Sequence, residues 1–520
     1  MSIGRSWVDG RSLWELIERR ADATPDGILA GDPHGRSMTF GEYREAACRA
    51  AAGFASLGVG AGVTVSWVQP TCIDAMVLTG ALCRLGAIQN PILPIYRQRE
   101  VGFVVRQVEA KLLVVPGVFR KFDYAEMARS IAAETPGLAV HVVDGVLPDG
   151  DPARLPPPPA IPATPEDSPV RWYFYTSGTT SDPKGARHTD ETLMSTTRGL
   201  CDVLDLKADD RHGFAFPFTH IGGIGWLMAG LIAGMAHLPV EAWDPDETIP
   251  FFAANGVTQA GAGTAFHQAY LAAQREQPSR PLFPNIRAFP GGAAPKPPQL
   301  HYDLKNEMGG VGIVAGYGLT ECPIIAMCST RDSDEKLAHT EGSVNPPGAE
   351  IRVVTLAGEV AAPGEEGEFR IKGPQLCKGY VDASLNAAAF DEEGYFRTGD
   401  LGYLDEDGFV VITGRLKDVI IRKGENISAK EIEDLLYEHP KVADVAVIGV
   451  PDPALGERCC AVVAAPEGND PLGFDEMVAY LKGQDLMLQK IPEQLEIVSE
   501  VPRNPAGKIL KQQLRERFAS

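Results

Sequence analysis

The sequence lacks the cysteine spacing of a disulfide framework or a zinc site. Its nine cysteines are scattered, except for the adjacent Cys459 and Cys460, and no two of them are spaced as Cys-x-x-Cys. This pattern is typical of reduced thiols in a cytosolic protein. The sequence contains no apolar run of about 18 residues, and residues 1–10 show no apolar core of a secretory signal. We therefore expect a cytoplasmic protein without a membrane span.

Positive charge is also scarce. The 520 residues include 48 Lys and Arg against 69 Asp and Glu, which gives a net charge of −21. Nucleic-acid backbones require a basic surface, and anionic membranes repel a negative one, so we expect neither as a partner. An apolar content of 44% is ordinary for a soluble globular protein. The length suggests roughly two to four domains.

The first part of the chain alternates between helical and extended patterns. In chain order we expect an amphipathic helix within 12–30 ending near Thr24-Pro25, a helix at 40–57, a strand at 63–68, a helix at 74–85, and strands at 111–115 and 170–175. This alternation predicts a layered α/β domain with parallel strands. The proline-rich segment 152–169 is expected to be an extended connector.

The pattern changes after about residue 340. Short alternating strands and glycine-rich turns predict a small β-barrel or sandwich within 340–414; the strands are expected at 351–354, 368–371 and 409–412. A compact piece of one small domain's size follows, with helices expected at 428–438 and 474–482 and strands at 442–450 and 460–465. The predicted fold is therefore α/β, with a large domain over 1–414 and a small α+β domain over 419–520.

Residues 175–185 carry the strongest functional signal. They read Tyr-Thr-Ser-Gly-Thr-Thr-Ser-Asp-Pro-Lys-Gly directly after an expected strand. Hydroxyls, successive backbone N–H groups and a lysine can together hold a polyphosphate; the residues that supply them are Thr176, Ser177, Gly178, Thr179, Thr180 and Lys184. The loop is not a Walker A motif, because no glycine directly precedes Lys184 and no Ser or Thr follows it. A solvated turn is the alternative explanation.

Five further segments combine glycine or proline with polar side chains. They are 217–223 with His220, 291–295, 316–321, 395–400 and 502–508. The carboxylate of Glu321 suits Mg²⁺, and the carboxylate of Asp400 can accept from two ribose hydroxyls. Each segment also has an ordinary structural explanation, such as a buried histidine, close packing, a helix cap, an Asx-turn or an exposed lysine.

Taken together, the six segments occur in the order typical of one family. On these motifs the chain resembles the adenylate-forming superfamily of acyl-CoA synthetases, adenylation domains and luciferases over essentially its whole length. The resemblance implies that ATP and a carboxylate give an acyl-adenylate and pyrophosphate. A thiol, here CoA, then takes the acyl group and releases AMP. ATP, Mg²⁺ and CoA are thus the expected cofactors.

The resemblance also assigns a nucleotide site. Loop 176–185 would hold the β- and γ-phosphates, although Ser181 stands where the family usually has glycine. Thr320 would reach the α-phosphate, and Glu321 would bind Mg²⁺. Segment 291–295 and Tyr317 would bracket the adenine, and Asp400 with Arg415 would bind the ribose. The remaining expected nucleotide residues are Gly292, Ala293, Ala294, Gly316 and Gly318.

Two lysines match functional positions of the family. Lys508 matches the catalytic lysine, whose charge offsets the repulsion when a carboxylate attacks the α-phosphate. Lys417 matches a hinge at 415–418, about which the small domain swings between the two half-reactions. The loop around Lys423, Gly424 and Glu425 would then face the site and admit CoA.

The acyl pocket is expected beside His220, which would also be catalytic. No acid precedes His220 within 216–220, which disfavours amino acids as substrates. Small residues leave room for a medium-chain, alicyclic or other bulky apolar acid, and the chain most resembles cyclohexanecarboxylate and medium-chain carboxylate–CoA ligases. The expected pocket residues are His220, Gly222, Gly223, Gly263, Thr264, Phe266 and Gly291.

The leading interpretation is an AMP-forming carboxylate–CoA ligase. The alternatives are an adenylation enzyme that loads a carrier-protein thiol, a nucleotide-binding scaffold with decayed catalytic parts, and a luciferase-type oxygenase. Decay is disfavoured because the charged residues Lys184, Glu321, Asp400, Lys417 and Lys508 are all present.

The resemblance suggests one form of regulation. Segment 502–508 is similar to sites at which family members are inactivated by a lysine acetyltransferase, although Asn504 replaces the usual threonine. Acetylation of Lys508 would remove the charge that adenylation needs. A homodimer is left open.

Overall fold

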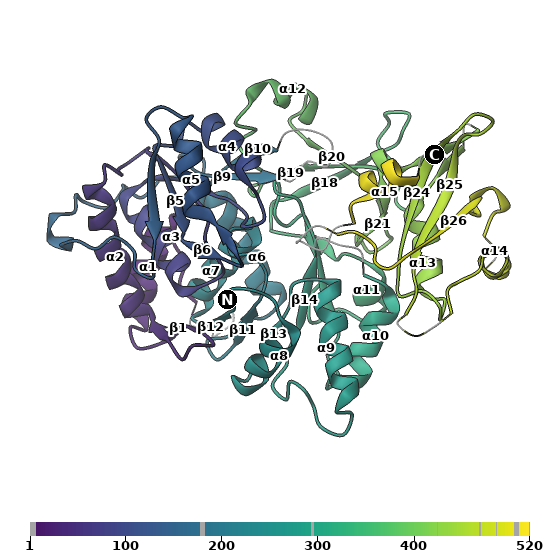
Figure 1. Cartoon of the computed structure of the whole chain (residues 1–520), viewed down its shortest axis with the longest axis horizontal. Helices are drawn as coiled ribbons and strands as arrows, with labels where there is room; N and C mark the ends of the chain where they lie inside the picture. The colour runs from purple at the N-terminus through teal and green to yellow at the C-terminus, as the bar shows by residue number, and fades with distance from the viewer. Residues whose placement is uncertain are drawn as a thin grey trace.

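The computed structural model describes residues 7–176, 183–292, 296–423, 425–466, 468, 470–484, 486–503 and 509–518. The chain forms a large N-terminal domain, purple to green in Figure 1, and a small C-terminal domain, yellow-green to yellow. Both combine helices with strands. The predicted α/β fold class with a large and a small domain is confirmed.

A six-stranded sheet forms one layer of the large domain. Its order is β10-β9-β4-β3-β5-β8. All neighbours from β9 to β8 are parallel, and only β10 is antiparallel to β9. The predicted parallel strands are therefore present. The strands are β3 (Thr64–Trp67), β4 (Ile88–Pro91), β5 (Leu112–Pro116), β8 (Ala139–Val143), β9 (Val170–Thr176) and β10 (Lys184–Thr189).

A second sheet, of order β13-β11-β12-β1-β2, lies beside the first. Its strands are β1 (Ile28–Gly31), β2 (Ser37–Thr39), β11 (Arg211–Phe214), β12 (Ala236–Pro239) and β13 (Gln259–Ala260). A short hairpin, β6 (Val118–Phe119) and β7 (Phe122–Asp123), stands apart. The helices of the large domain are α1 (Leu13–Ala23), α2 (Phe40–Ser56), α3 (Ile73–Leu85), α4 (Gln98–Gln107), α5 (Tyr124–Ala133), α6 (Asp190–Val203), α7 (Ile221–Ala233), α8 (Pro245–Ala254), α9 (Thr264–Glu276), α10 (Pro298–Glu307), α11 (Asp334–His339) and α12 (Asn386–Ala389).

The expected helix within 12–30 is shorter than the segment. α1 ends at Ala23, and residues 28–31 form β1 instead. Thr24 has φ −146°, because the residue before a proline avoids the helical region. The prediction that the helix ends near Thr24-Pro25 is confirmed.

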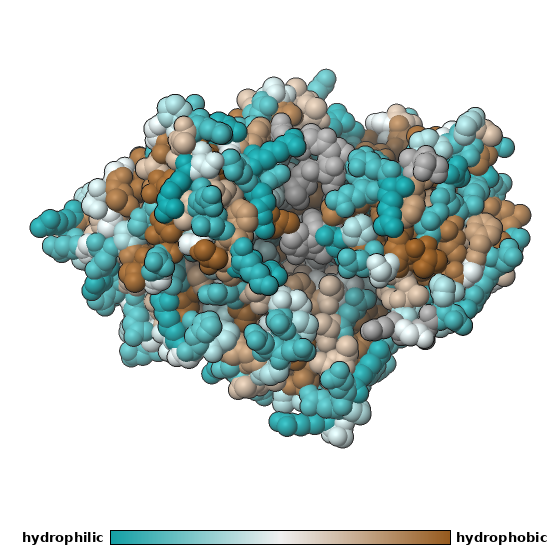
Figure 2. Space-filling view, in the orientation of Figure 1, coloured by the Kyte–Doolittle hydropathy of each residue, from teal (hydrophilic) through white to brown (hydrophobic). Residues whose placement is uncertain are grey.

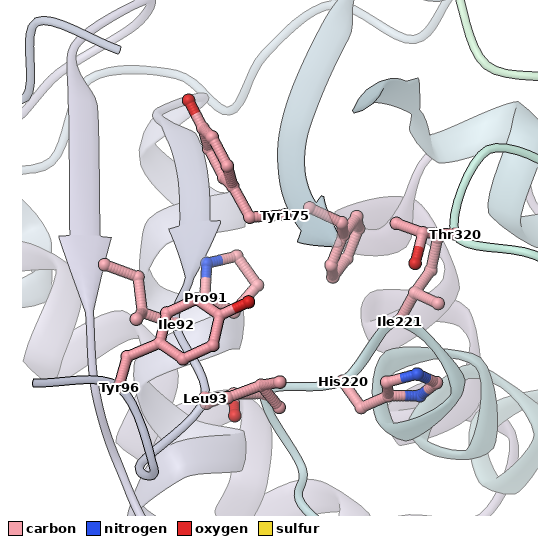
Figure 3. A pocket seen from close by; sticks show the side chains of 10 residues that line it. Pro91, Ile92, Leu93, Tyr96, Tyr175, His220, Ile221 and Thr320 are labelled. Carbon is pink, nitrogen blue, oxygen red and sulfur yellow. The ribbon is translucent and has the colours of Figure 1, made fainter. Parts of the chain in front are cut away.

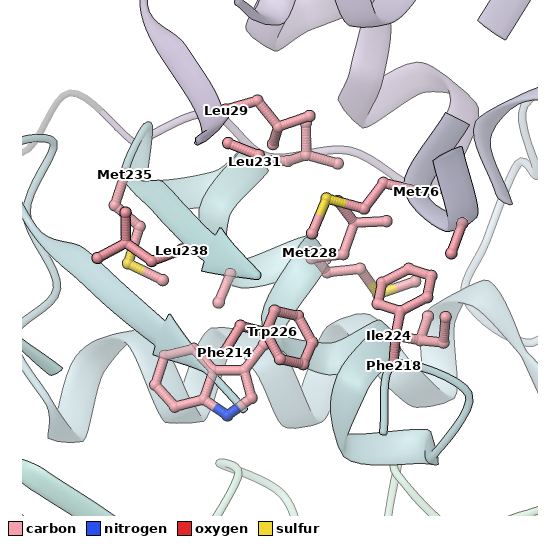
Figure 4. Packing of buried hydrophobic residues seen from close by; sticks show 14 of the residues in the cluster. Leu29, Met76, Phe214, Phe218, Ile224, Trp226, Met228, Leu231, Met235 and Leu238 are labelled. Carbon is pink, nitrogen blue, oxygen red and sulfur yellow. The ribbon is translucent and has the colours of Figure 1, made fainter. Parts of the chain in front are cut away.

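The main hydrophobic core lies around α7. Nearly every residue of this helix is buried, as expected for a helix that is apolar on all sides. Figure 4 shows Met228 and Leu231 of α7 in the buried cluster that also contains Leu238 of β12. The rings of Trp67 and Phe218 lie 6.1 Å apart and link the first sheet to the segment before α7. This packing fixes the start of α7, where His220 lies.

Two smaller sheets complete the large domain. The third sheet consists of β14 (Phe289–Gly292), β15 (Ile313–Tyr317), β16 (Ala326–Met327) and β17 (Ser343–Val344). The fourth consists of β18 (Glu350–Val354), β19 (Gly367–Lys372), β20 (Phe396–Leu404) and β21 (Val410–Arg415). A small β-barrel or sandwich is expected within 340–414. Over the described residues this part is an open antiparallel sheet of order β18-β19-β20-β21.

The small domain follows the one-turn 3₁₀ helix Leu416–Asp418. Its sheet runs β23-β22-β25-β24, with β26 paired to β25. Its elements are β22 (Ile420–Arg422), β23 (Glu425–Ile427), α13 (Ala429–Tyr437), β24 (Asp444–Asp452), β25 (Gly456–Ala464), α14 (Phe474–Gly483), β26 (Gln494–Val498) and α15 (Lys511–Phe518). In the described part of the chain, no helix has the length and apolar character that a bilayer span requires.

Candidate functional site

A cavity of about 850 Å³ lies where the large and small domains meet. The face shown in Figure 2 is indented between the two domains. Segments far apart in the sequence form its wall, and most of the predicted site residues are among them. Those that line it are Thr176, Lys184, His220, Gly222, Gly263, Thr264, Phe266, Gly291, Gly292, Gly316, Gly318, Thr320, Glu321, Arg415 and Lys417.

Two parallel strands bring glycine-rich motifs to one edge of the cavity. β14 and β15 pair with Gly292 opposite Gly316. A Cβ on Gly292 would lie 2.7 Å from the carbonyl oxygen of Gly316, so only glycine allows this approach. The carboxyl ends of parallel strands form the crevice in which α/β proteins bind ligands. The segment after β15 carries Thr320 and Glu321 into this crevice.

Asp400 is held from two sides. Its Oδ2 accepts from the Tyr317 hydroxyl at 2.7 Å, and its Oδ1 lies 2.6 Å from Arg415 Nε. Asp400 stands opposite Arg415 in the β20–β21 pair, which explains their contact. The ring of Tyr317 is 6% exposed and packs against Phe369. Among the described residues, the cavity wall includes Arg415 but neither Tyr317 nor Asp400, which lie behind it.

Glu321 is oriented by a tyrosine that the sequence did not reveal. The Tyr380 hydroxyl donates to Glu321 Oε1 at 2.6 Å. The pKa of Tyr380 is raised mainly by burial and, second, by the negative charge of Glu321. Lys184 Nζ lies 5.9 Å from the centre of the Tyr380 ring. An isolated β-bridge between Tyr380 and Ala186 of β10 places Tyr380 next to Glu321 and Lys184. Its own neighbours in the sequence form no motif.

A buried histidine fixes the backbone of Thr320. His188 Nε2 donates to the Thr320 carbonyl at 2.8 Å, and its Nδ1 lies 2.9 Å from Thr192 Oγ1. Burial lowers the pKa of His188 to about 4, so the ring is neutral at neutral pH. This residue was also missed, since a single histidine on a strand carries no distinctive signal.

His220 is the N-cap of α7. Its Nδ1 accepts from the backbone N–H of Gly222 at 3.1 Å, which leaves the proton on Nε2. Burial lowers the pKa of His220 to about 4. His220 also lines a second cavity of about 10 Å³, in which His220, Ile221 and Thr320 face Pro91, Ile92 and Tyr96 (Figure 3). A neutral N–H donor thus stands next to Thr320.

The other end of the large cavity is mostly apolar. Gly222 and Gly225 of α7 leave space there, and the ring of Phe266 packs 4.7 Å from that of Trp243. Gly223 packs inward instead, because a Cβ there would lie 2.3 Å from the Phe218 carbonyl oxygen. Further residues of this wall that the sequence did not predict are Leu193, Thr196, Thr197, Leu200, His212, Phe216 and Trp226.

The small domain contributes its own wall to the cavity. Tyr437, Asp444 and Arg503 line it. Arg503 Nη2 and Nε contact the Asp444 carboxylate at 2.7 and 3.1 Å, and Tyr437 bonds to the same carboxylate. Lys417 also lines the cavity, and burial lowers its pKa. Lys423, with φ +50°, is not among the described wall residues.

Some predicted residues cannot be placed. Ser177, Gly178, Thr179, Thr180, Ala293, Ala294, Gly424 and Lys508, and the side chain of Glu425, lie outside the described residues. In the part of the chain that is described, no three His, Cys, Asp or Glu side chains cluster as a metal site. Glu321 is therefore the one predicted metal ligand to consider here.

Comparisons with known proteins identify the family of the chain. The model of the AMP-binding enzyme family matches residues 17–381, and that of the AMP-binding enzyme C-terminal domain matches residues 431–508. A medium-chain fatty-acid–CoA ligase of Escherichia coli is 30% identical over 98% of this chain and 91% of its own. A salicyl-AMP ligase/salicyl-S-ArCP synthetase of Mycobacterium tuberculosis is 31% identical over 96% and 90%.

Among solved structures, ATP-bound MatB from Rhodopseudomonas palustris superposes with a TM-score of 0.87 at 28% identity, covering 98% of this chain and 99% of that one. The likeness thus extends over both domains. Relatives that are named CoA ligases agree with the predicted enzyme class. Because the first family model alone covers more than half of its length, the chain belongs to the AMP-binding enzymes and is an adenylate-forming enzyme, as its motifs predict.

Proposed function

We propose that the protein activates a bulky, largely apolar carboxylic acid with ATP and transfers the acyl group to CoA, with release of pyrophosphate and AMP. The observation that supports this proposal most strongly is that a single cavity has one polar half and one apolar half. Polar groups around Thr320, Glu321 and Arg415 suit a nucleotide, and the wall around Phe266 suits an apolar acyl group. His220 stands where the halves meet, so the carboxylate would lie near its N–H and the hydroxyl of Thr320.

The nucleotide half supports the assigned roles. Arg415 and the Asp400 behind it are held together as a rigid pair, which suits binding of the ribose hydroxyls. Lys184 and Thr176 at the ends of β10 and β9 flank the predicted phosphate loop. A stacked adenine would lie on the Gly291–Gly292 backbone, which has no side chain to obstruct it.

Mg²⁺ fits a site built on Glu321. Mg²⁺ is commonly held by one or two carboxylates together with substrate phosphates and water, and Glu321 is a single buried carboxylate in the cavity wall. Tyr380 on Oε1 orients the group. The ion would supply positive charge to the triphosphate there.

We infer that the small domain is placed for adenylation. Asp444 and Arg503 of this domain line the cavity, and Arg503 belongs to the segment 502–508 that ends at Lys508. Lys508 would offset the charge repulsion between the carboxylate and the α-phosphate.

Transfer to CoA would follow rotation of residues 419–520 against 1–414 about the hinge at 415–418. The hinge residue Asp418 accepts from Arg515 Nη2 of α15 at 2.8 Å, so one end of the hinge is tied to the small domain. Rotation would bring the loop of Lys423, Gly424 and Glu425 to the cavity.

A panel of short, medium-chain, alicyclic and aromatic acids, assayed with ATP, Mg²⁺ and CoA, tests the proposal by AMP formation. AMP that depends on acid and CoA supports it. Pyrophosphate release that never depends on CoA would favour the second candidate, loading of a carrier-protein thiol, which is the reaction named for the mycobacterial relative. No turnover with any acid would refute both.

Acetylation of Lys508 is proposed as a regulatory step of the same reaction. Acetyl-CoA and a lysine acetyltransferase should modify Lys508 and abolish adenylation, because the charge is lost. Mass spectrometry that finds Lys508 unmodified would contradict this.

A further inference from the structure

A row of polar side chains crosses the sheet beneath the acyl half of the cavity. His212 of β11 is in register with His237 of β12 and with Gln259 of β13, all in parallel pairing. Side chains at paired positions point to the same face of a sheet. All three are 0% exposed. The Gln259 amide donates to Asp210 Oδ1 at 3.5 Å, whereas the rings of Phe214 and Trp226 pack against His212.

Helix α7 covers this face and fixes the ring of His212. Trp226 stacks on His212, with ring centres 3.8 Å apart and planes 10° apart. Gly230, one turn further, lets His237 approach, because a Cβ there would lie 2.2 Å from His237 Nε2. The ring of Phe214 of β11 lies 5.1 Å from that of His212, and Figure 4 shows Phe214 and Trp226 in the same buried cluster. Of the polar row, His212 belongs to the cavity wall, together with Trp226 and Phe216.

One nitrogen of His212 is already used. Its Nδ1 lies 3.3 Å from Nδ1 of His237, so one ring donates and the other accepts. The Nε2 atoms of His212 and His237 and the Oε1 of Gln259 have no partner among the described residues. Bulk water does not reach these groups. A buried polar atom without a partner is costly, and each one calls for an explanation.

The position of Trp226 along α7, relative to His220, shows which part of a substrate could contact His212. Trp226 follows His220 by six residues (220 to 226), which is about 9 Å along a helix axis. His212, stacked on Trp226, is therefore remote from the reacting carboxylate. Burial, and next the neighbouring His237, keep the pKa of His212 well below its usual value. The ring is neutral, so it supplies no positive charge to offset the burial of a second carboxylate.

We propose that His212 Nε2 selects a cyclic carboxylic acid that carries a hydroxyl at the end remote from its carboxylate. The rings of Trp226 and Phe216 beside His212 suit a flat or alicyclic ring. A hydroxyl both donates and accepts, so it satisfies Nε2 whichever nitrogen carries the proton. This assignment rests on the proposed function and narrows its substrate class.

The test compares acids in matched pairs. The pairs are benzoate and para-hydroxybenzoate, phenylpropanoate and para-hydroxyphenylpropanoate, and cyclohexanecarboxylate and its para-hydroxy derivative. With ATP, Mg²⁺ and CoA, at least one pair should show a kcat/KM about tenfold or more higher for the hydroxylated acid, because its analogue leaves a buried nitrogen unpaired. Equal or lower values for the hydroxylated acid in every pair would overturn the proposal.

Two variants locate the effect. His212→Phe keeps an aromatic ring against Trp226 but removes both nitrogens, and it should abolish the preference while still accepting the apolar acid. Thr197→Val is the matched control: Thr197 also lines the cavity, but its hydroxyl already donates to the Leu193 carbonyl at 2.9 Å. Its substitution should leave the ratio within each pair unchanged. A preference that survives in His212→Phe would contradict the assignment.

A binding measurement separates this inference from the proposed function. Acyl-sulfamoyl-adenosine analogues of each pair bind without turnover, and the hydroxylated analogue should raise the melting temperature of the wild-type protein more than its partner does. If no acid gives AMP but this difference is found, the CoA-ligase proposal fails and the role of His212 stands. If AMP forms and no pair differs in either assay, the role of His212 fails alone.

Discussion

The Tyr317 hydroxyl offers a direct test of how the Asp400 carboxylate is positioned. Tyr317→Phe removes one oxygen and keeps the ring that packs on Phe369. The lost bond, 2.7 Å long, joins a neutral donor to a charged acceptor that is only 2% exposed. Bonds of this type contribute about 1.5–3 kcal/mol. Arg415 remains paired with Asp400, so the carboxylate is not left as an isolated buried charge.

If Asp400 binds the ribose, part of this energy should appear in nucleotide binding. Since about 1.4 kcal/mol corresponds to a factor of ten, the KM for ATP should rise about tenfold to a hundredfold. The kcat should change less, because the hydroxyl does not face the reacting atoms. Deoxy-ATP, which lacks one ribose hydroxyl, should show a smaller difference between wild type and variant.

ATP–pyrophosphate exchange with a saturating carboxylate measures these constants. Tyr395→Phe is the matched control. The Tyr395 hydroxyl donates to Glu350 of β18, in the sheet that carries Asp400, at 2.6 Å, but among the described residues Tyr395 does not line the cavity. It should leave the KM for ATP unchanged. If Tyr317→Phe behaves like Tyr395→Phe, or affects ATP and deoxy-ATP equally, the inferred link between Tyr317, Asp400 and the ribose is wrong.

Other predictions concern the metal, the lysine, the phosphate loop and pH. Tyr380→Phe should raise the Mg²⁺ concentration for half-maximal activity about tenfold, because the ligand carboxylate loses its orienting bond; an unchanged Mg²⁺ titration would count against it. Lys508→Ala should slow adenylation by about 10²–10³ and spare thioester formation from supplied acyl-adenylate; equal losses in both steps would argue otherwise. Ser181→Gly, which restores the residue usual in the family, should keep or raise activity. A large loss of activity would show that this loop works differently from the loop of other family members. The pKa of buried His267 is about 4 instead of 6.5, so the unfolded state binds more protons between these values, and the free energy of unfolding should fall as pH drops through this window. In urea unfolding, His267→Gln should reduce the decrease of the midpoint as pH drops from 6.5 to about 4. His34→Gln, at an exposed position, should leave that decrease unchanged.

Local sequence patterns were sufficient for much of the fold and of the site. The expected helices at 40–57 and 74–85 correspond to α2 and α3, and the capping box of Thr39 and Glu42 marks where α2 begins. Thr320 and Glu321, which their motif assigns to the nucleotide site, both line the cavity. In each case the information is contained within a few consecutive residues.

What could not be predicted depends on contacts between distant segments. Tyr380 lies 59 residues beyond the Glu321 that it orients, and nothing in its own neighbourhood indicates this partner. Asp400 was recognised, but its strand β20 was not, because residues 396–404 contain two glycines and alternate poorly. Tyr317 was expected against the adenine, whereas its ring packs behind the wall. Its contact with the adenine stays a prediction.

The wall that both domains share links affinity to domain position. Tyr437, Asp444 and Arg503 belong to the small domain, yet they line the same cavity as Thr320 and Glu321. A ligand that touches both domains stabilises this domain arrangement by the difference between its binding free energies in this and other arrangements. Conversely, a protein held in this arrangement binds the ligand more tightly by the same free energy. A substitution that weakens this contact surface would therefore lower affinity for ligands it never touches, simply by making the competent arrangement rarer.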